Sequence, residues 1–215
     1  MLRDRIEPGV QALFVGINPG MRSEAIGHHF AGYSNRFWKL LYESGLVPQP
    51  IRAEDDDRLP EWGFGITNLA ARATPGMDTL EPAEFIAGGR ILRRKVRRFK
   101  PSIVVLIGVT VFRSLFERPG RLPVRLGLQP ECLEGARVFV LPNPSGRNAN
   151  FSYAEMLASF RKLRELLSNP AARTSRTSRT PRTSRTFGAS ASKLAVGRRI
   201  RAQCPQRPRR CRRQA

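Results

Sequence analysis

The sequence predicts an α/β fold of three layers, α/β/α, around a central and mainly parallel sheet. Apolar runs of strand length alternate with segments of helical spacing along residues 10–167. The run at residues 102–108 (SIVVLIG) has the composition of a strand that is buried on both faces of a parallel sheet. Polar loops follow three of the strand-like runs, and α/β sheets bind ligands at such loops.

The individual elements follow from the same pattern. Residues 10–16 (VQALFVG) predict a first strand, and residues 36–45 predict a helix that Gly45 ends. The segment Pro82–Phe99 has helical periodicity despite two consecutive glycines at its centre. The other expected elements are strands at residues 65–70, 102–108 and 137–143 and helices at residues 111–116 and 152–167.

The pattern stops after Ser168, where the segment ARTSRTSRTPRTSRT has no apolar face. From residue 169 on, the chain has 14 of its 38 Lys and Arg and none of its 17 Asp and Glu, so the formal net charge of +21 falls to +7 for residues 1–168. Such a segment buries too little apolar surface to offset its ordering entropy. We therefore expect a folded domain at residues 1–168 and a basic, disordered tail at residues 169–215. The tail is either a non-specific nucleic-acid arm or an accidental extension.

Cysteine and histidine usage limits the possible chemistry. The three cysteines and two histidines form no CxxC motif and no Cys/His cluster with the spacing of a zinc or iron–sulfur site. We expect no metal and no cofactor. No signal peptide pattern opens the chain, and no run approaches 18 apolar residues. We therefore expect neither secretion nor a membrane partner.

The first polar loop, in FVGINPGMRS (residues 14–23), carries one uncharged polar side chain, Asn18. GINPG is neither a GxGxxG nor a Walker motif, which argues against a nucleotide phosphate cradle. The Asn18 amide offers both a donor and an acceptor, and it could hold a water molecule or bind a ligand. The alternative is that Asn18 only braces its own turn.

The second loop, GHHFAGYSNRFW, contains both histidines among aromatic residues. An aromatic face beside amide and imidazole groups suits a planar heterocycle. Phe30 is the better stacking candidate, because Phe37 shares a helix face with Leu40 and Leu41 and is expected in the core. A hydrogen-bonding role for the histidines is at least as reasonable as catalysis.

The third loop, LPNPSGRNAN, places Ser145 and Arg147 after a strand. The serine hydroxyl and backbone donors suit a phosphate group, and Arg147 could enter a duplex or bind its backbone. The alternative is that NPSG is ordinary turn chemistry. Likewise, RRKVRRF (residues 93–99) is either a basic binding surface or a solvated helix face.

In their order along the chain, GINPG, GHHF ahead of NRFWK, GITNLAARATPG, GGRIL and LPNPSGR resemble the mismatch-specific uracil/thymine DNA glycosylase family across residues 10–167. The NPSG form is similar to bacterial members, whereas GHHF, TNLAARATPG and GLQP are similar to the thymine-DNA glycosylase branch. The resemblance implies a uracil-DNA glycosylase-like fold and hydrolysis of the N-glycosidic bond of uracil, or of thymine or other damaged pyrimidines, opposite guanine in double-stranded DNA. It also implies a monofunctional, metal-free monomer in the bacterial cytoplasm, associated with the nucleoid.

The resemblance also implies roles for individual residues. Asn18 would position the attacking water, and Asp78 is the one carboxylate of the middle loop that could assist. The alternative is that Asp78 has no catalytic role and is only an acidic residue at a helix N-terminus or in solvent. The base pocket would contain Gly16, Ile17, Ser23, His29, Phe30 and Asn68. The DNA contacts would come from Asn143, Ser145, Gly146 and Arg147. The competing hypothesis is a non-catalytic protein that binds mismatched or damaged bases in DNA.

Overall fold

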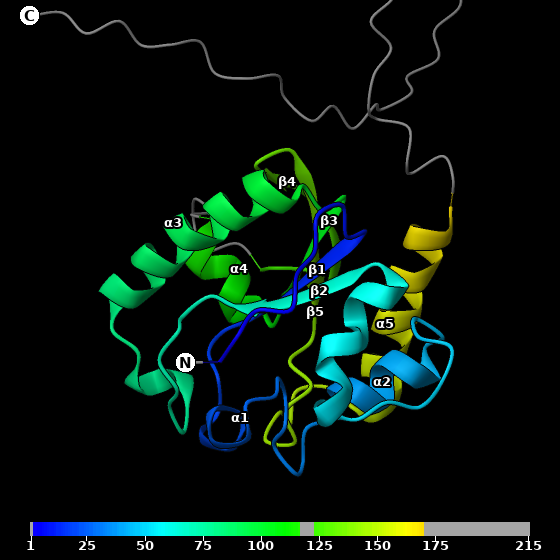
Figure 1. Cartoon of the computed structure of the whole chain (residues 1–215), viewed down its shortest axis with the longest axis horizontal. Coiled ribbons are helices and arrows are strands. Elements are labelled where there is room, and N and C mark those ends of the chain that lie inside the picture. The colour runs from blue at the N-terminus through cyan, green and yellow to red at the C-terminus, as the bar shows by residue number, and fades with distance from the viewer. Residues whose placement is uncertain (1, 117–122, 170–215) are drawn as a thin grey trace, which may run out of the picture.

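A five-stranded sheet forms the centre of this chain in the computed structural model, which describes residues 2–116 and 123–169 (Figure 1). Strands β2 (Phe64–Asn68), β1 (Ala12–Gly16), β3 (Ile103–Ile107) and β5 (Ala136–Leu141) run parallel, whereas β4 (Gly127–Leu133) is antiparallel to β5. The expected three-layer fold with a mainly parallel sheet is confirmed, and the apolar run at residues 102–108 is its central strand. In spatial order the strands are β2, β1, β3, β5 and β4.

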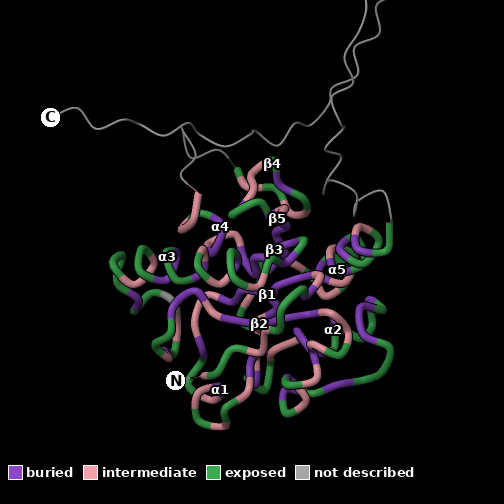
Figure 2. Tube along the Cα trace, turned by 45° about the horizontal axis from the view of Figure 1, so that its top comes forward, coloured by how far each residue is buried: buried purple, intermediate pink, exposed green. Residues whose placement is uncertain are grey.

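Helices cover both faces of the sheet because successive strand side chains point to opposite sides. In β1, Ala12 and Phe14 pack into one apolar cluster, whereas Leu13 and Val15 pack into the other. Figure 1 shows the two helical layers on either side of the strands, and Figure 2 shows the strands as the most buried part of the trace. One layer contains α2 (Phe37–Glu43), the 3-10 helix η1 (Ala53–Trp62) and α5 (Tyr153–Ser168); the other contains α3 (Pro82–Phe99) and α4 (Val109–Leu115).

The glycine pair inside α3 has a packing role. A side chain on Gly88 would overlap the backbone carbonyl of Leu69, in the loop after β2. The missing Cβ therefore lets α3 lie directly against this loop.

The predicted bounds are close to the observed ones. The helix Pro82–Phe99 has the expected ends, and every other expected element begins and ends within two residues of its prediction. The pattern did not predict α1 (Met21–Ile26), η1 or β4. The sequence of η1 is mostly polar, and β4 contains Pro130 and an irregular register with β5, so neither has a clear hydrophobic period.

The predicted tail at residues 169–215 lies outside the described residues, apart from Asn169 at the end of α5. None of the helices in the described ranges is long and apolar enough to cross a lipid bilayer.

Candidate active site

The loops that follow β1 and β2 lie side by side at the carboxyl edge of the sheet. The Ala70 amide donates to the Ile17 carbonyl at 2.8 Å, and the Thr74 amide donates to the Pro19 carbonyl at 3.1 Å. These bonds continue the parallel pairing of β1 and β2 beyond the strand ends. The GINPG and TNLAARATPG motifs therefore form one connected surface.

The loop after β5 joins the same surface through two further contacts. The Arg147 guanidinium donates to the Pro75 carbonyl at 3.0 Å, and the Arg36 amide donates to the Pro144 carbonyl at 3.0 Å. The structure thus brings the three polar loops together, as the strand pattern predicted.

Asn18 has a fixed amide orientation. Its Nδ2 donates to the Thr74 hydroxyl oxygen at 2.7 Å and to the Pro19 carbonyl at 2.9 Å, which uses both amide hydrogens. Within the described residues, no hydrogen bond reaches Asn18 Oδ1, and the side chain is half-buried. The carbonyl oxygen is therefore the group that Asn18 can offer to a water molecule or a ligand.

Thr74 is a functional candidate to which sequence reasoning assigned no role. It is buried, it accepts from Asn18, and its own hydroxyl donates to the Gly76 carbonyl. The hydroxyl hydrogen is committed to Gly76, so the Thr74 oxygen can only accept from Asn18. The signal in the sequence was the ATPG turn, but nothing in that turn alone indicates that Thr74 meets Asn18.

Gly16, Phe30 and Asn68 form a second group, which we call the base site. A Cβ placed on Gly16 would lie 2.5 Å from Asn68 Oδ1 and 3.2 Å from Phe30 Cζ. An amide oxygen and an aromatic edge therefore converge over a residue that has no side chain. Such a combination suits a flat, polar ring.

Phe37 lies in the core as its helix position predicted, and Phe30 packs against it, while the stacking of Phe30 on a base stays a prediction. The Phe30 ring stacks on Phe37, with centroids 4.3 Å apart and an angle of 26° between the planes. Phe37 is fully buried and belongs to the core, whereas Phe30 is half-buried at the core's edge. The backbone of Phe30 has a φ of 51°, in the left-handed region that bulky residues rarely adopt.

The neighbours of Phe30 hold this unfavourable conformation in place. The His29 amide donates to Asp56 Oδ2 at 2.8 Å, and the Trp38 indole donates to the His29 carbonyl at 3.0 Å. On the other side, the Ala31 amide donates to the Ser23 hydroxyl oxygen at 3.0 Å. Bonds on both sides of Phe30 therefore fix the loop that presents its ring.

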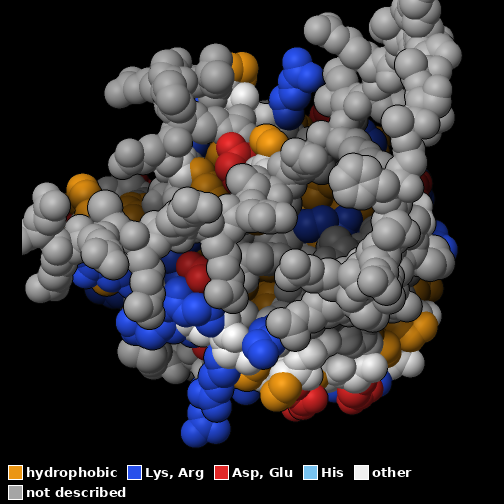
Figure 3. All heavy atoms as spheres, turned by 90° about the horizontal axis from the view of Figure 1, so that it is seen from above, with side chains coloured by type: hydrophobic (Ala, Val, Ile, Leu, Met, Phe, Trp, Pro, Cys, Tyr) orange, Lys and Arg blue, Asp and Glu red, His pale blue; other side chains and the backbone are white. Residues whose placement is uncertain are grey.

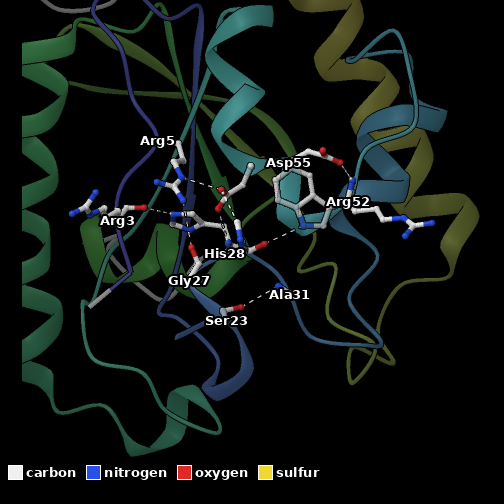
Figure 4. Close-up of polar contacts among 11 residues, drawn as sticks. Arg3, Arg5, Ser23, Gly27, His28, Ala31, Arg52 and Asp55 are labelled. Carbon is white, nitrogen blue, oxygen red and sulfur yellow. Dashed lines mark hydrogen bonds and ion pairs between the residues drawn. The ribbon is translucent and has the colours of Figure 1, made fainter. Parts of the chain in front are cut away.

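Asp56 is the fully buried anchor of this loop. Besides the His29 amide, its carboxylate accepts from Arg5 Nε at 2.9 Å and contacts His28 Nδ1 at 3.1 Å. Figure 4 shows Arg5 and His28 among the residues of this polar network. Three partners offset the cost of burying the charge.

His29 is buried and hydrogen-bonded at both ring nitrogens. Nε2 lies 2.9 Å from the Arg3 carbonyl, and Nδ1 lies 3.4 Å from Asn68 Nδ2. Burial lowers the pKa of His29 below its usual 6.5, against the opposing effects of the Arg3 carbonyl and the Asp56 carboxylate. The ring is therefore neutral near pH 7, with one donor and one acceptor nitrogen.

Three other predicted site residues have more modest surroundings. Ile17 is half-buried and packs against the apolar cluster of α3 and α4. The Ser23 hydroxyl oxygen accepts a hydrogen bond from the Ala31 backbone amide. Asp78 is exposed in the 3-10 turn η2 (Met77–Thr79), and no described hydrogen bond joins it to Asn18. The roles proposed for Ser23 in the base pocket and Asp78 in catalysis stay predictions.

The predicted DNA-contact loop is organised by its own side chains. Asn143 Oδ1 accepts from the Ser145 amide at 3.0 Å, and Ser145 Oγ accepts from the Arg147 amide at 3.3 Å. A side chain on Gly146 would overlap Ser34, which explains the glycine. The exposed Arg147 side chain projects from this turn toward the loop after β2.

Several features lie outside this site. A shallow cavity of about 640 Å³ between the end of α2 and α5, lined by residues such as Tyr42 and Arg164, contains none of the predicted site residues. Lys and Arg side chains gather at the lower left of Figure 3, on the side where Figure 1 draws α3. On that helix Arg93 and Arg97 pair with Glu134. The described residues contain no cluster of three or more His, Cys, Asp and Glu that could hold a metal ion.

The fold defines a class of protein: a three-layer α/β/α domain with polar loops gathered at the carboxyl edge of its parallel sheet, where such folds bind ligands. Residues 4–168 match the family described as the Uracil DNA glycosylase superfamily, so this chain belongs to that superfamily. Membership identifies it as a hydrolase that acts on uracil in DNA, in base excision repair.

Proposed function

We propose that this protein is a monofunctional, mismatch-specific member of the superfamily, which hydrolyses the N-glycosidic bond of uracil opposite guanine in double-stranded DNA. The observation that carries the proposal is the Asn18 amide. Thr74 and Pro19 take both of its hydrogens, so its carbonyl oxygen is the group that can bind a water molecule, two residues along the chain from Gly16 of the base site. The five ordered motifs that resemble the mismatch-specific family support the same assignment.

Asn18 positions the nucleophile in this mechanism. Its carbonyl oxygen accepts a hydrogen from a water molecule, which turns a water lone pair toward the sugar C1′. As the glycosidic bond breaks, its electron pair leaves with the base and the sugar gains oxocarbenium character. An amide cannot act as a general base, so the water loses its proton only after attack, and the DNA phosphates help to stabilise the cation. We therefore expect slow excision that depends on the substrate.

The base is recognised at the base site. One face of the Phe30 ring packs on Phe37, so uracil stacks on the opposite face. The missing side chain of Gly16 lets the Asn68 amide and the edge of Phe30 approach its backbone, and Asn68 then provides an amide for the base.

The loop after β5 accounts for duplex binding. Ser145 and the backbone of its turn contact a phosphate, and Arg147 leaves the Pro75 carbonyl to fill the space of the flipped nucleotide. Flipping costs about a few kcal/mol and least for a mispaired base. Preference for uracil opposite guanine then arises from the weaker pairing of the mispair.

The positions of the lysines support a monofunctional reaction. A glycosylase that also cleaves the strand needs an amine nucleophile at C1′. Lys95 is held by Asp4 at 2.6 Å and Thr67 at 2.9 Å, and Lys39 faces Glu43 on α2. Lys100 and Lys162 lie on the helical layers, and no lysine of the described residues lies in the three site loops.

A strand-scission assay tests the proposal. Labelled duplexes with G·U, G·T, A·U and G·C pairs and a uracil-containing single strand are incubated with excess protein and then treated with alkali. We expect scission only after alkali, and faster for G·U than for A·U by about 100-fold. Asn18→Ala should abolish scission and spare duplex binding. G·U binding by the wild type without scission would instead support the non-catalytic mismatch-binding alternative.

We also propose that residues 1–168 are sufficient for this chemistry and act as a monomer. The family match ends at residue 168, and α5 ends there as well. A chain truncated after Asn169 should therefore excise uracil at the full-length rate under single-turnover conditions and elute as a monomer.

A further inference from the structure

Tyr33 is an exposed aromatic residue in the loop that carries Phe30 of the base site. It is 89% exposed, the highest value among the large hydrophobic residues that the structure describes as exposed. A single exposed ring is common on protein surfaces. Its significance therefore depends on how the ring is held and on what lies beside it.

The Tyr33 ring is held by Arg22, in helix α1. Arg22 Nη1 donates to the Tyr33 hydroxyl oxygen at 2.8 Å, and the guanidinium carbon lies 3.9 Å from the ring centroid. Through Nε the same guanidinium donates to the Ala31 carbonyl at 2.8 Å. A planar guanidinium can make these contacts together, whereas the single ammonium group of a lysine cannot. Arg22 thus orders a side chain that would otherwise rotate freely in solvent.

The same helix fixes Tyr33 relative to Phe30. Ser23, the neighbour of Arg22 in α1, accepts from the Ala31 amide at 3.0 Å (Figure 4). One helix therefore holds both the amide and the carbonyl of Ala31, the residue directly after Phe30. The chain from Phe30 to Tyr33 spans at most about 11 Å, and stacked nucleotides rise about 3.4 Å each along one strand. Neighbouring nucleotides of one strand are therefore within reach of both rings.

On its other side, Tyr33 adjoins the predicted DNA-contact loop. The Asn35 amide donates to the Gly32 carbonyl at 2.9 Å, which places Tyr33 and Ser34 at the two central positions of a hydrogen-bonded turn. Ser34 packs so closely on Gly146 that a side chain on this glycine would overlap it. The turn that carries Tyr33 thus connects the base site to the loop after β5.

The charge beside the ring suits nucleic acid. Among the described residues no carboxylate pairs with Arg22, so its positive charge is available to a DNA phosphate. Proteins that bind single-stranded nucleic acid combine such a cation with an aromatic ring on which a base stacks. A paired base inside a duplex is covered by its neighbours on both faces, so only an unpaired base can stack on Tyr33.

We propose that Tyr33 and Arg22 form a second nucleobase-binding surface, which we call the platform, where an unpaired base next to the flipped uracil stacks on the Tyr33 ring. Arg22 is the positioning residue, and its charge meets the adjoining phosphate. The platform is separate from the base site, which receives the uracil, and it accepts a neighbouring base of any identity. The inference rests on the proposed function only in that DNA crosses the site with its uracil flipped.

A double-mutant cycle between protein and DNA tests the platform. The probes are single strands with one non-cleavable 2′-fluoroarabino-uridine, whose 5′ or 3′ neighbour is either intact or replaced by an abasic analogue. Loss of one of these neighbouring bases should weaken wild-type binding about tenfold, measured by fluorescence anisotropy. Tyr33→Ala should bind the intact strand about tenfold more weakly, and the same base loss should then change its affinity by less than about twofold.

Three further variants separate stacking from general effects on the surface. Tyr42→Ala is the matched control, because Tyr42 is also an exposed tyrosine but lines the cavity between α2 and α5, and this variant should bind as the wild type does. Tyr33→Leu keeps apolar bulk without an aromatic face and should behave as Tyr33→Ala does. Arg22→Lys keeps the charge but not the hold on the ring, so it should retain the salt dependence of binding and lose part of the response to base removal.

A Tyr33→Ala protein that responds to base removal as the wild type does would refute the platform, and so would a wild type that binds no single strand. In a fully paired duplex, Tyr33→Ala should weaken binding by less than about twofold, and a loss as large as with the single strand would contradict the restriction to unpaired bases. Failure of the wild type to excise uracil from any substrate would count against the proposed function and leave the binding cycle valid.

Discussion

The Asn18 side-chain amide lies 2.7 Å from the Thr74 hydroxyl oxygen and donates to it. The two residues are far apart in the sequence and come from the loops after β1 and β2. Because the Thr74 hydroxyl hydrogen is directed to Gly76, the threonine acts as an acceptor and holds the amide nitrogen of Asn18 away from the reaction. The orientation of the catalytic candidate thus depends on a residue outside its own loop.

Replacement of Thr74 by valine should therefore slow excision. Thr74→Val keeps the shape of the buried side chain but removes the acceptor, so the Asn18 amide can rotate. We expect single-turnover excision of uracil to fall by about 10- to 100-fold, with duplex affinity unchanged. Thr79→Val is the matched control, since the Thr79 hydroxyl donates to the same Gly76 carbonyl but has no contact with Asn18. Equal rates for the two variants would contradict the role of Thr74.

A methyl group on Gly16 should distort the base site, because Asn68 and Phe30 must move to accommodate it. The added Cβ of Gly16→Ala would meet Asn68 Oδ1 at 2.5 Å and the Phe30 ring at 3.2 Å. We expect the excision rate to fall by about 100-fold, because the base is displaced relative to the water. Gly20→Ala in the same loop meets no atom within 4 Å and should keep its activity. Comparable losses in both variants would show that the loop, and not the base site, is sensitive.

Loss of the buried Asp56 charge should destabilise the protein. Asp56→Asn leaves the Arg5 guanidinium and the His29 amide with a weaker acceptor, and it removes the ion pair. We expect urea denaturation to show a free energy of unfolding lower by about 3 kcal/mol. Asp57→Asn, at an exposed neighbouring position of η1, should change it by less than about 0.5 kcal/mol. An Asp56→Asn protein as stable as its control would mean that Asp56 does not anchor the loop.

The stability of the protein should fall on mild acidification because of His29. Burial lowers the pKa of this ring, so the unfolded chain, with the usual pKa of 6.5, binds a proton before the folded chain does. The stability contributed by neutral His29 is therefore present above pH 6.5 and is lost as the pH falls from there toward the lowered pKa.

Thermal melting between pH 8 and 5 measures this effect. The melting temperature of the wild type should drop more steeply below pH 6.5 than that of His29→Gln, which does not titrate. Parallel curves for the wild type and His29→Gln would contradict the assignment.

Arg147 should affect duplex substrates more than single strands. Arg147→Ala removes the side chain proposed to fill the duplex after flipping, so excision from a G·U duplex should fall by about tenfold. The salt dependence of duplex binding should also weaken by about one unit of slope. Arg94→Ala, on the exposed face of α3, is the control for general loss of charge. A proportional loss with single-stranded substrate would argue against insertion into the duplex.

Much of the architecture could be predicted from the sequence because it depends on hydrophobic period. The apolar run that became β3 is buried on both faces, and α3 has a regular apolar stripe, so both were located closely. The antiparallel strand β4 was missed because Pro130 and a bulge interrupt its alternation. The helix η1 was missed because its sequence is mostly polar, and its buried Asp56 is indistinguishable in sequence from Asp55 and Asp57.

For the candidate site, the sequence by itself determined which residue types follow each strand: an asparagine in a stiff turn, an aromatic residue ahead of α2, and a serine–glycine–arginine loop after β5. Only the tertiary structure decided how these groups are oriented. Thr74 fixes the orientation of the Asn18 amide, and the buried Asp56 holds the backbone next to Phe30. Both effects are hydrogen bonds between residues distant in sequence, so their geometry exists only once the chain has folded.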